Sequence, residues 1–230
     1  MKILTVDTSS NCSSVALSDG ALLLGECILG EDRCHSGRLL ESISQLLAAA
    51  ALTPDSLDAF AVSLGPGSFT GVRVGIATVK GLAIATGKPV VGFSSLAMLA
   101  MNLPFSCAQV APMFDARKSE VYAALYHCDS LPEPISPDAV LSPERFLAGI
   151  DSPTLFLGEG ARRYRELIGS TLGDLALFSP WHADLPRASA GAVIALDAAL
   201  QENFTPLALL NPTYLRASEA ELAKRRRESN

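Results

Sequence analysis

Short apolar runs alternate with longer segments of helical apolar spacing in the first part of the chain. A short apolar run bounded by turn-forming residues predicts a strand, whereas apolar residues three and four positions apart predict a helix. The pair Asp19-Gly20 is a tight-turn signal, so the first three strands are predicted to form an antiparallel meander. Strands are predicted at 3–7, 14–18, 21–29, 59–64 and 90–93, and helices at 36–52, 71–86 and 94–101. This order favours an α/β domain with helices packed on a mixed sheet.

The chain after Asn102-Leu103-Pro104 is less regular, and no internal repeat is evident by inspection. Its predicted elements are a hairpin at 109–127, a strand at 155–157 and helices at 161–168 and 188–201. We therefore predict an N-terminal α/β lobe over 1–101, a smaller C-terminal α/β lobe over 102–216 and a basic tail over 217–230.

Two of the predicted helices, at 36–52 and 71–86, are apolar on more than one face. Only Arg73 and Lys80 are charged within 71–86, and they lie on one narrow stripe of the helix because they are a heptad apart. The small residues of this helix would let another helix backbone come close; they are Gly71, Gly75, Thr78, Gly81 and Ala85. We interpret these helices as the docking surface for a partner; the alternative is that they are interior and covered by the second half of the chain. The candidate interface residues are His35, Leu39, Ile43, Leu46, Val72, Gly75, Ile76 and Val79.

The loop from Gly65 to Gly71 joins a predicted strand to a predicted helix, a setting in which backbone amides can hold an anion. Its spacing does not match G-x-G-x-x-G, because Thr70 stands where a glycine is required, and no Walker lysine follows. Tight-turn geometry is the favoured explanation. Asp7 ends the first strand, where it either binds magnesium or caps its own turn. The candidate cofactor-binding residues are Asp7, Gly65, Gly67 and Thr70.

No catalytic or metal constellation is evident in the sequence. His35 is followed four positions later by Leu39, so a helical pair of metal ligands is incomplete. His127 and His182 have no neighbouring ligand pattern, and no nucleophile and base can be paired. The sequence thus predicts neither a metal site nor a catalytic site.

Composition narrows the class of protein further. The five cysteines are scattered and odd in number, which fits a reducing cytosol better than a disulfide framework. The N-terminal apolar run is too short for a signal peptide and no long apolar stretch was identified, so a soluble cytoplasmic protein with no membrane partner is expected. The net charge of −6 argues against autonomous binding to nucleic acid. The basic cluster at 224–227 is either a solvated tail or a contact to RNA phosphates within a complex.

Five segments, taken in order along the whole chain, resemble the bacterial TsaB (YeaZ) family. They are Ile3–Ser9, His35-Ser36, Gly65–Gly75, Asp115–Tyr122 and Asn211–Arg216. The resemblance implies an actin-like ATPase fold of the ribonuclease H-like (ASKHA) type with two lobes.

The same resemblance implies a role in forming N6-threonylcarbamoyladenosine at position 37 of tRNAs that read codons beginning with A. It implies a non-catalytic scaffold that pairs with the catalytic paralogue TsaD through the helices at 36–52 and 71–86. The ATPase TsaE joins this pair, and the protein can also form a homodimer through the same two helices. tRNA, ATP and magnesium would then enter only through the complex, and the chain would hold no cofactor of its own. The paralogue carries an H-x-x-x-H motif, and in this chain Leu39 stands where the second histidine of that motif would be. The alternatives are an autonomous actin-like phosphotransferase and a glycoprotease-like hydrolase.

Overall fold

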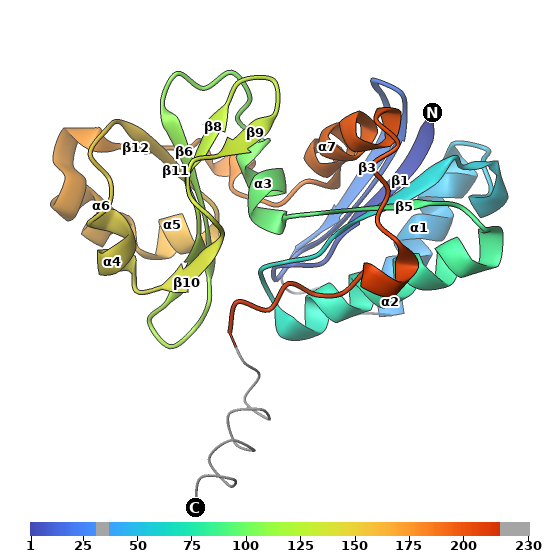
Figure 1. The fold of residues 1–230 in the computed structure, drawn as a ribbon, viewed down its shortest axis with the longest axis horizontal. Coiled ribbons are helices and arrows are strands. Elements are labelled where there is room, and N and C mark those ends of the chain that lie inside the picture. The colour runs from blue at the N-terminus through green and yellow to red at the C-terminus, as the bar shows by residue number, and fades with distance from the viewer. Residues whose placement is uncertain (31–36, 217–230) are drawn as a thin grey trace, which may run out of the picture.

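The computed structural model describes residues 1–30 and 37–216, which form two α/β lobes lying side by side (Figure 1). The sheet of the first lobe has the strand order β3-β2-β1-β4-β5. Its first three strands pair antiparallel, and β4 and β5 continue the sheet parallel to β1. This confirms the predicted opening meander. The strands are β1 (Lys2–Asp7), β2 (Ser13–Asp19), β3 (Leu22–Leu29), β4 (Ala59–Ser63) and β5 (Val90–Phe93).

The sheet of the second lobe has the order β10-β7-β6-β11-β12, with β8 and β9 paired beside β6. β6, β7 and β10 are antiparallel, whereas β11 and β12 are parallel to β6. The predicted hairpin is present, but its return strand is divided into β7 and β8. The strands are β6 (Gln109–Asp115), β7 (Val121–Ala123), β8 (Tyr126–Cys128), β9 (Pro132–Pro134), β10 (Ala139–Leu141), β11 (Thr154–Leu157) and β12 (Ala176–Phe178).

The two sheets repeat one plan, which the sequence does not reveal. In each lobe three strands form an antiparallel meander. A fourth strand then pairs in parallel with the first strand of the meander, and a fifth pairs in parallel with the fourth. Backbone pairing defines this plan, so two halves with different side chains can share it. As a result β1 and β6 are equivalent strands, and Asp7 and Asp115 stand at their equivalent ends.

Helices cover both faces of the first sheet (Figure 1). α1 and α2 pack on one face, where their apolar residues share a core with β1, β2 and β4. α7 packs on the opposite face, against β1, β2 and β5. The helices are α1 (Gly37–Ala49), α2 (Phe69–Thr86), α3 (Ser95–Ala100), α4 (Pro143–Leu147), α5 (Glu159–Arg163), α6 (Arg165–Leu172) and α7 (Ala188–Leu200); short 3-10 helices are η2 (Pro54–Ser56), η3 (Gly173–Leu175), η4 (Trp181–Ala183) and η5 (Leu207–Leu209).

The position of α7 corrects the predicted lobe boundary. Its alanines share a core with Ile3 and Phe93 of the first lobe. The chain after it also stays there, since Thr205 N donates to Val90 O at 2.8 Å. Assigning all of 102–216 to the second lobe is therefore wrong for 188–210. An alanine-rich helix lies flat on whichever sheet it meets, and its sequence does not say which sheet that is.

α2 begins at Phe69, two residues before the predicted start, because the Ser68 hydroxyl accepts a hydrogen bond from Gly71 N and caps it. Among the described residues it is the helix whose length and composition would suffice to cross a membrane, contrary to the expectation that no such stretch exists. Its inner residues are nevertheless packed on the sheet, and Val72, Ile76 and Val79 are buried. It is a core helix with one open face.

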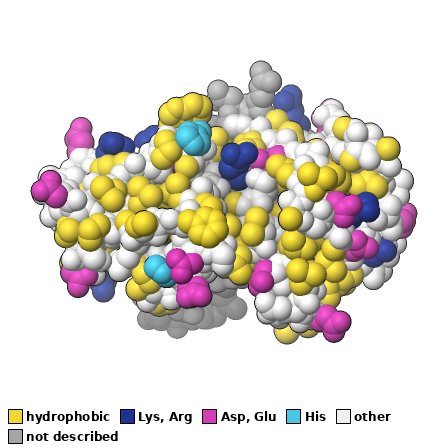
Figure 2. Space-filling model, turned by 90° about the horizontal axis from the view of Figure 1, so that it is seen from above, with side chains coloured by type: hydrophobic (Ala, Val, Ile, Leu, Met, Phe, Trp, Pro, Cys, Tyr) yellow, Lys and Arg dark blue, Asp and Glu magenta, His cyan; other side chains and the backbone are white. Residues whose placement is uncertain are grey.

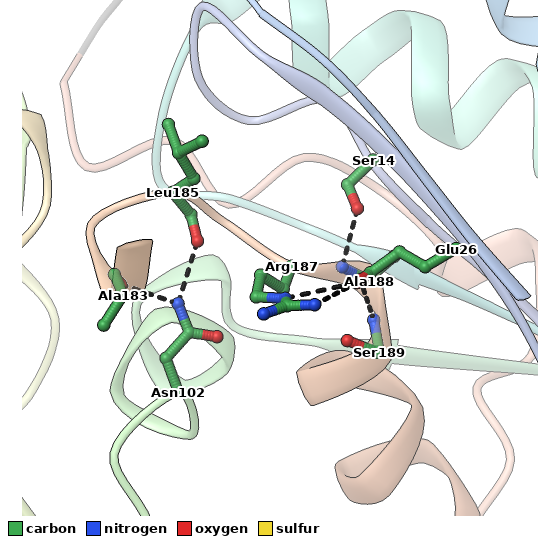
Figure 3. Close-up of polar contacts among 8 residues, drawn as sticks. All are labelled: Ser14, Glu26, Asn102, Ala183, Leu185, Arg187, Ala188 and Ser189. Atoms are coloured by element: carbon green, nitrogen blue, oxygen red, sulfur yellow. Dashed lines mark hydrogen bonds and ion pairs between the residues drawn. The ribbon is translucent and has the colours of Figure 1, made fainter. Parts of the chain in front are cut away.

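A compact set of polar contacts fastens the start of α7 to strands β2 and β3 of the first lobe (Figure 3). Glu26 of β3 accepts hydrogen bonds from the Arg187 guanidinium at 2.7 Å and from Ser189 N at 2.8 Å. The Ser14 hydroxyl accepts from Ala188 N at 2.8 Å. The Glu26 carboxylate and the Ser14 hydroxyl thus accept hydrogen bonds from two amides at this helix N-terminus. The carboxylate also neutralises the neighbouring Arg187. The entry of the chain into the first lobe is fixed at this point.

A second contact ties together the two segments that cross between the lobes. Asn102, just after α3, donates from Nδ2 to the carbonyl oxygens of Ala183 and Leu185, both at 2.8 Å (Figure 3). The outgoing and returning crossings are therefore bonded to each other, which holds the lobes at one relative position.

The last described segment, 210–216, forms a strap from the first lobe to the second. Thr213 N donates to Leu64 O at 2.7 Å on the first lobe. On the second lobe, Arg216 Nη1 donates to Ala116 O at 3.0 Å. The strap is thus fastened at both ends and closes one side of the space between the lobes.

Candidate functional site

A cavity of about 680 Å³ lies between the lobes. The turn after β1 and the first turn of α2 line it from the first lobe, and the turn between β6 and β7 lines it from the second. Of the predicted cofactor residues, Gly67 and Thr70 line this cavity, whereas Asp7 and Gly65 do not. The structure therefore brings together two of the four. The described lining residues are Ser9, Ser10, Asn11, Gly67, Ser68, Phe69, Thr70, Arg73, Phe114, Asp115, Ala116, Arg117, Lys118, Tyr122, Glu159 and Arg216.

The glycines of the loop and of α2 serve close packing against the end of β1. A Cβ added to Gly67 would lie 2.1 Å from Ser9 O, and one added to Gly71 would lie 2.0 Å from Thr8 O. A Cβ at Gly75 would lie 2.4 Å from Thr8 Oγ1. Gly71 and Gly75 are among the small residues predicted to admit the backbone of another helix. What they lie against is Thr8, in the turn after this chain's own first strand.

Asp7 is sealed beneath this packing. Its side chain has no exposed surface, and its Oδ1 accepts hydrogen bonds from the Ser63 hydroxyl and from Ser9 N. Burial raises the pKa of the carboxyl above its ordinary value, although hydrogen bonds from Ser63 and Ser9 oppose the shift. Asp7 thus fixes the turn after β1 from within, as in the capping interpretation.

Asp7→Asn is expected to gain stability relative to the wild type as the pH rises. A raised pKa means that the folded protein binds the proton more tightly than the unfolded chain does, so the wild type loses stability as pH rises from about 4 through the raised pKa. Asparagine keeps the accepting oxygen and has no charge to bury. Chemical denaturation of both proteins between pH 4 and pH 8 measures the difference; a difference that moves against the variant with rising pH would contradict the assignment.

The residues predicted to face a partner lie mostly in the chain's own core. Leu39, Ile43, Val72, Gly75, Ile76 and Val79 are buried, and Leu46 is partly buried. His35 lies outside the described residues. The named residues lie on the inward side of each helix, because apolar periodicity marks the face that packs on the sheet. These side chains support the outer surface and do not form it.

The outer surface of α1 and α2 consists of other residues. On α2 it is built from Ala77, Gly81, Ile84 and Ala85, and Ile84 is 71% exposed. A Cβ added to Gly81 would meet no atom within 4 Å, so the helix backbone is open there. On α1, Leu40 is an exposed apolar side chain. This small-residue surface, hereafter the outer α1/α2 face, admits the close approach of another helix.

Exposed apolar side chains alone do not mark this face. Figure 2 shows the molecule from above, away from α2, and hydrophobic side chains also occur there over both lobes, among charged ones. Leu200 of α7 and Trp181 are examples of strongly exposed apolar residues elsewhere. The outer α1/α2 face is distinguished by small residues and an open backbone on a long helix.

No local pattern in the sequence connects the cationic side chains around the cavity. Arg73, Arg117, Lys118 and Arg216 line it. They come from α2, from the β6–β7 turn and from the strap, which are far apart in sequence. Within the part of the chain that the structure describes, no group of three or more histidine, cysteine, aspartate or glutamate residues could hold a metal ion.

Comparisons with known proteins agree with this architecture. The family model described as TsaD, tRNA N6-adenosine threonylcarbamoyltransferase, matches residues 30–224. The chain is 32% identical over 225 residues to the tRNA threonylcarbamoyladenosine biosynthesis protein TsaB of Bacillus subtilis, covering 96% of each. Among solved structures, YeaZ from Pseudomonas aeruginosa has a TM-score of 0.82 at 32% identity, covering 93% of this chain and 99% of that one.

A more distant likeness concerns the fold alone. (R)-2-hydroxyglutaryl-CoA dehydratase component A of Acidaminococcus fermentans has a TM-score of 0.53 at 14% identity, covering 87% of this chain and 99% of that one. The repeated sheet plan and these neighbours define a two-lobed α/β protein of the actin-like ATPase fold. Within that class, the chain belongs to the TsaB (YeaZ) family.

Proposed function

We propose that this protein is a non-catalytic scaffold subunit in the formation of N6-threonylcarbamoyladenosine at position 37 of tRNAs that read codons beginning with A. Membership of the TsaB family supports a role in this tRNA modification. The match to the TsaD family model supports TsaD, the catalytic paralogue, as the partner. The protein would pair with it in the cytoplasm.

The observation that carries the proposal is the outer α1/α2 face. A helix interface needs small residues where two backbones meet and an apolar side chain beside them. The small residues here are Gly81 and its neighbours Ala77 and Ala85, and the apolar side chain is that of Ile84. The partner is inferred to be a helix of a chain with the same fold, which can be the paralogue or a second copy of this protein.

The other components then join through the complex. The ATPase TsaE, ATP and magnesium, and the tRNA are assigned to the assembly and not to this chain alone. The net charge of −6 supports this division, because free binding of tRNA by an acidic protein would lack phosphate neutralisation.

Reconstitution of tRNA modification tests the proposal. We expect no threonylcarbamoyladenosine from this protein alone, and a loss of at least tenfold in the modification rate when it is left out of a mixture of paralogue, ATPase, ATP and the remaining substrates. Liquid chromatography of the digested tRNA gives the product. Modification by this protein alone, or an undiminished rate without it, would refute the scaffold role.

The competing proposal of an autonomous phosphotransferase has less support. It requires Asp7 to reach a metal–phosphate group, whereas Asp7 is sealed and does not line the cavity. The hydrolase alternative requires a second ligand at position 39, where a buried leucine packs in the core.

A further inference from the structure

The cavity between the lobes carries a local excess of positive charge in an acidic protein. Its described lining residues include the cations Arg73, Arg117, Lys118 and Arg216 and the carboxylates Asp115 and Glu159. The first turn of α2 also lines it, which adds the positive end of an 18-residue helix. Three elements from both lobes therefore bring cationic side chains to the wall of one cavity.

The turn that presents two of these cations has an unfavourable backbone conformation. Arg117, Lys118 and Ser119 have φ values of 61°, 54° and 57°, so three successive residues other than glycine are left-handed. Such residues persist only where the surroundings hold them. Hydrogen bonds from Arg117 N to Asp115 Oδ1 at 3.0 Å and from Glu120 N to Arg117 O at 3.0 Å hold this turn.

The actin-like fold implies a magnesium nucleotide between its lobes, and the residues of this chain do not fit the metal. Asp7 is sealed away from the cavity. Its equivalent, Asp115, does line it, but Oδ2 is paired with Arg163 Nη1 at 2.7 Å and Oδ1 accepts from Arg117 N. Magnesium prefers free carboxylate oxygens together with phosphate. Both carboxylate oxygens of Asp115 are thus already engaged by groups of the protein.

We propose that this cavity binds a small phosphate-bearing anion without a divalent metal. Arginine side chains and backbone amides at a helix N-terminus neutralise phosphate directly. The exposed Thr70 side chain on the cavity wall provides a further hydrogen-bond donor. The cavity is separate from the outer α1/α2 face. Binding of an anion there would therefore be a second property of the protein, beside its proposed scaffold role.

The volume of the cavity suits a small ligand. The strap runs along one side of it, with Arg216 bonded to Ala116 O and ion-paired with Glu120. A space of about 680 Å³ holds a pyrophosphate or a mononucleotide.

Titration calorimetry of the full-length protein tests the proposal with three probes: pyrophosphate in EDTA, pyrophosphate with magnesium, and a short RNA duplex. We expect saturable binding of pyrophosphate in EDTA that is no tighter when magnesium is added. Binding only with magnesium, binding of RNA but not pyrophosphate, or no binding at all would each overturn it.

Arg117→Gly separates a ligand-binding role from a structural one. Glycine accepts the left-handed conformation without strain, so the thermal midpoint should stay level or rise while the affinity for pyrophosphate falls at least tenfold. Arg145→Ala is the matched control, an exposed arginine of the same lobe that does not line the cavity, and it should leave binding unchanged. Equal affinities for the two variants would contradict the site. Pairing with the paralogue, measured separately, should be intact in both.

Discussion

Gly71→Ala is expected to destabilise the protein by about 3 kcal/mol or more. The added methyl group would clash with backbone atoms, which cannot move aside as a flexible side chain can. The added Cβ would lie 2.0 Å from Thr8 O. The Thr8 hydroxyl also donates to Gly71 O at 2.7 Å, so the start of α2 and the end of β1 are bonded where the clash occurs. Either α2 moves away from the sheet or the turn after β1 is displaced. Chemical denaturation monitored by circular dichroism measures the loss.

Gly81→Ala is the matched control on the same helix. Its Cβ would meet no atom within 4 Å, so alanine should raise the free energy of unfolding by about 0.5–1 kcal/mol through its higher helix propensity. Both glycines lie in the predicted helix at 71–86, and only the structure shows that one is packed against backbone and the other is open. If Gly71→Ala proved as stable as Gly81→Ala, the packing of α2 on β1 described above would be incorrect.

The sequence predicts the first lobe well because its elements are local. Tight-turn residues and apolar runs mark the meander, and Ser94 caps α3 as expected, accepting from Leu96 N and Ala97 N. Apolar periodicity also finds α1 and α2. Periodicity reports burial, however, and a buried residue such as Ile76 can be covered by its own sheet or by a partner. Only the structure, which shows where the sheet lies, tells which side of each helix faces outward.

The remaining features depend on contacts between distant segments. Which sheet α7 covers is decided by tertiary packing, in which Gly191 lies against Phe93. The cation cluster of the cavity combines Arg73 and Arg216, which no local pattern connects. The sequence predicts 115–119 as the turn of a hairpin, but the left-handed residues of this turn include no glycine that would reveal their conformation.

Ile84→Asp is expected to weaken pairing with the paralogue by at least tenfold, corresponding to about 1.4 kcal/mol or more. Ile84 is 71% exposed on the outer α1/α2 face, so an aspartate there is harmless to the isolated protein. In the complex it would place a charge without a partner in a dry interface. Ile76→Asp would be a poor test, since Ile76 is buried and its replacement would unfold the lobe.

Leu200→Asp is the matched control, because Leu200 is 69% exposed and lies on α7, which covers the opposite face of the first sheet. Both variants should keep the thermal midpoint of the wild type. The decisive measurement is the affinity of the TsaD paralogue for wild type, Ile84→Asp and Leu200→Asp, determined side by side by calorimetry. We expect the affinity to fall at least tenfold for Ile84→Asp alone. Wild-type affinity in Ile84→Asp, or an equal loss in both variants, would contradict docking through the outer α1/α2 face.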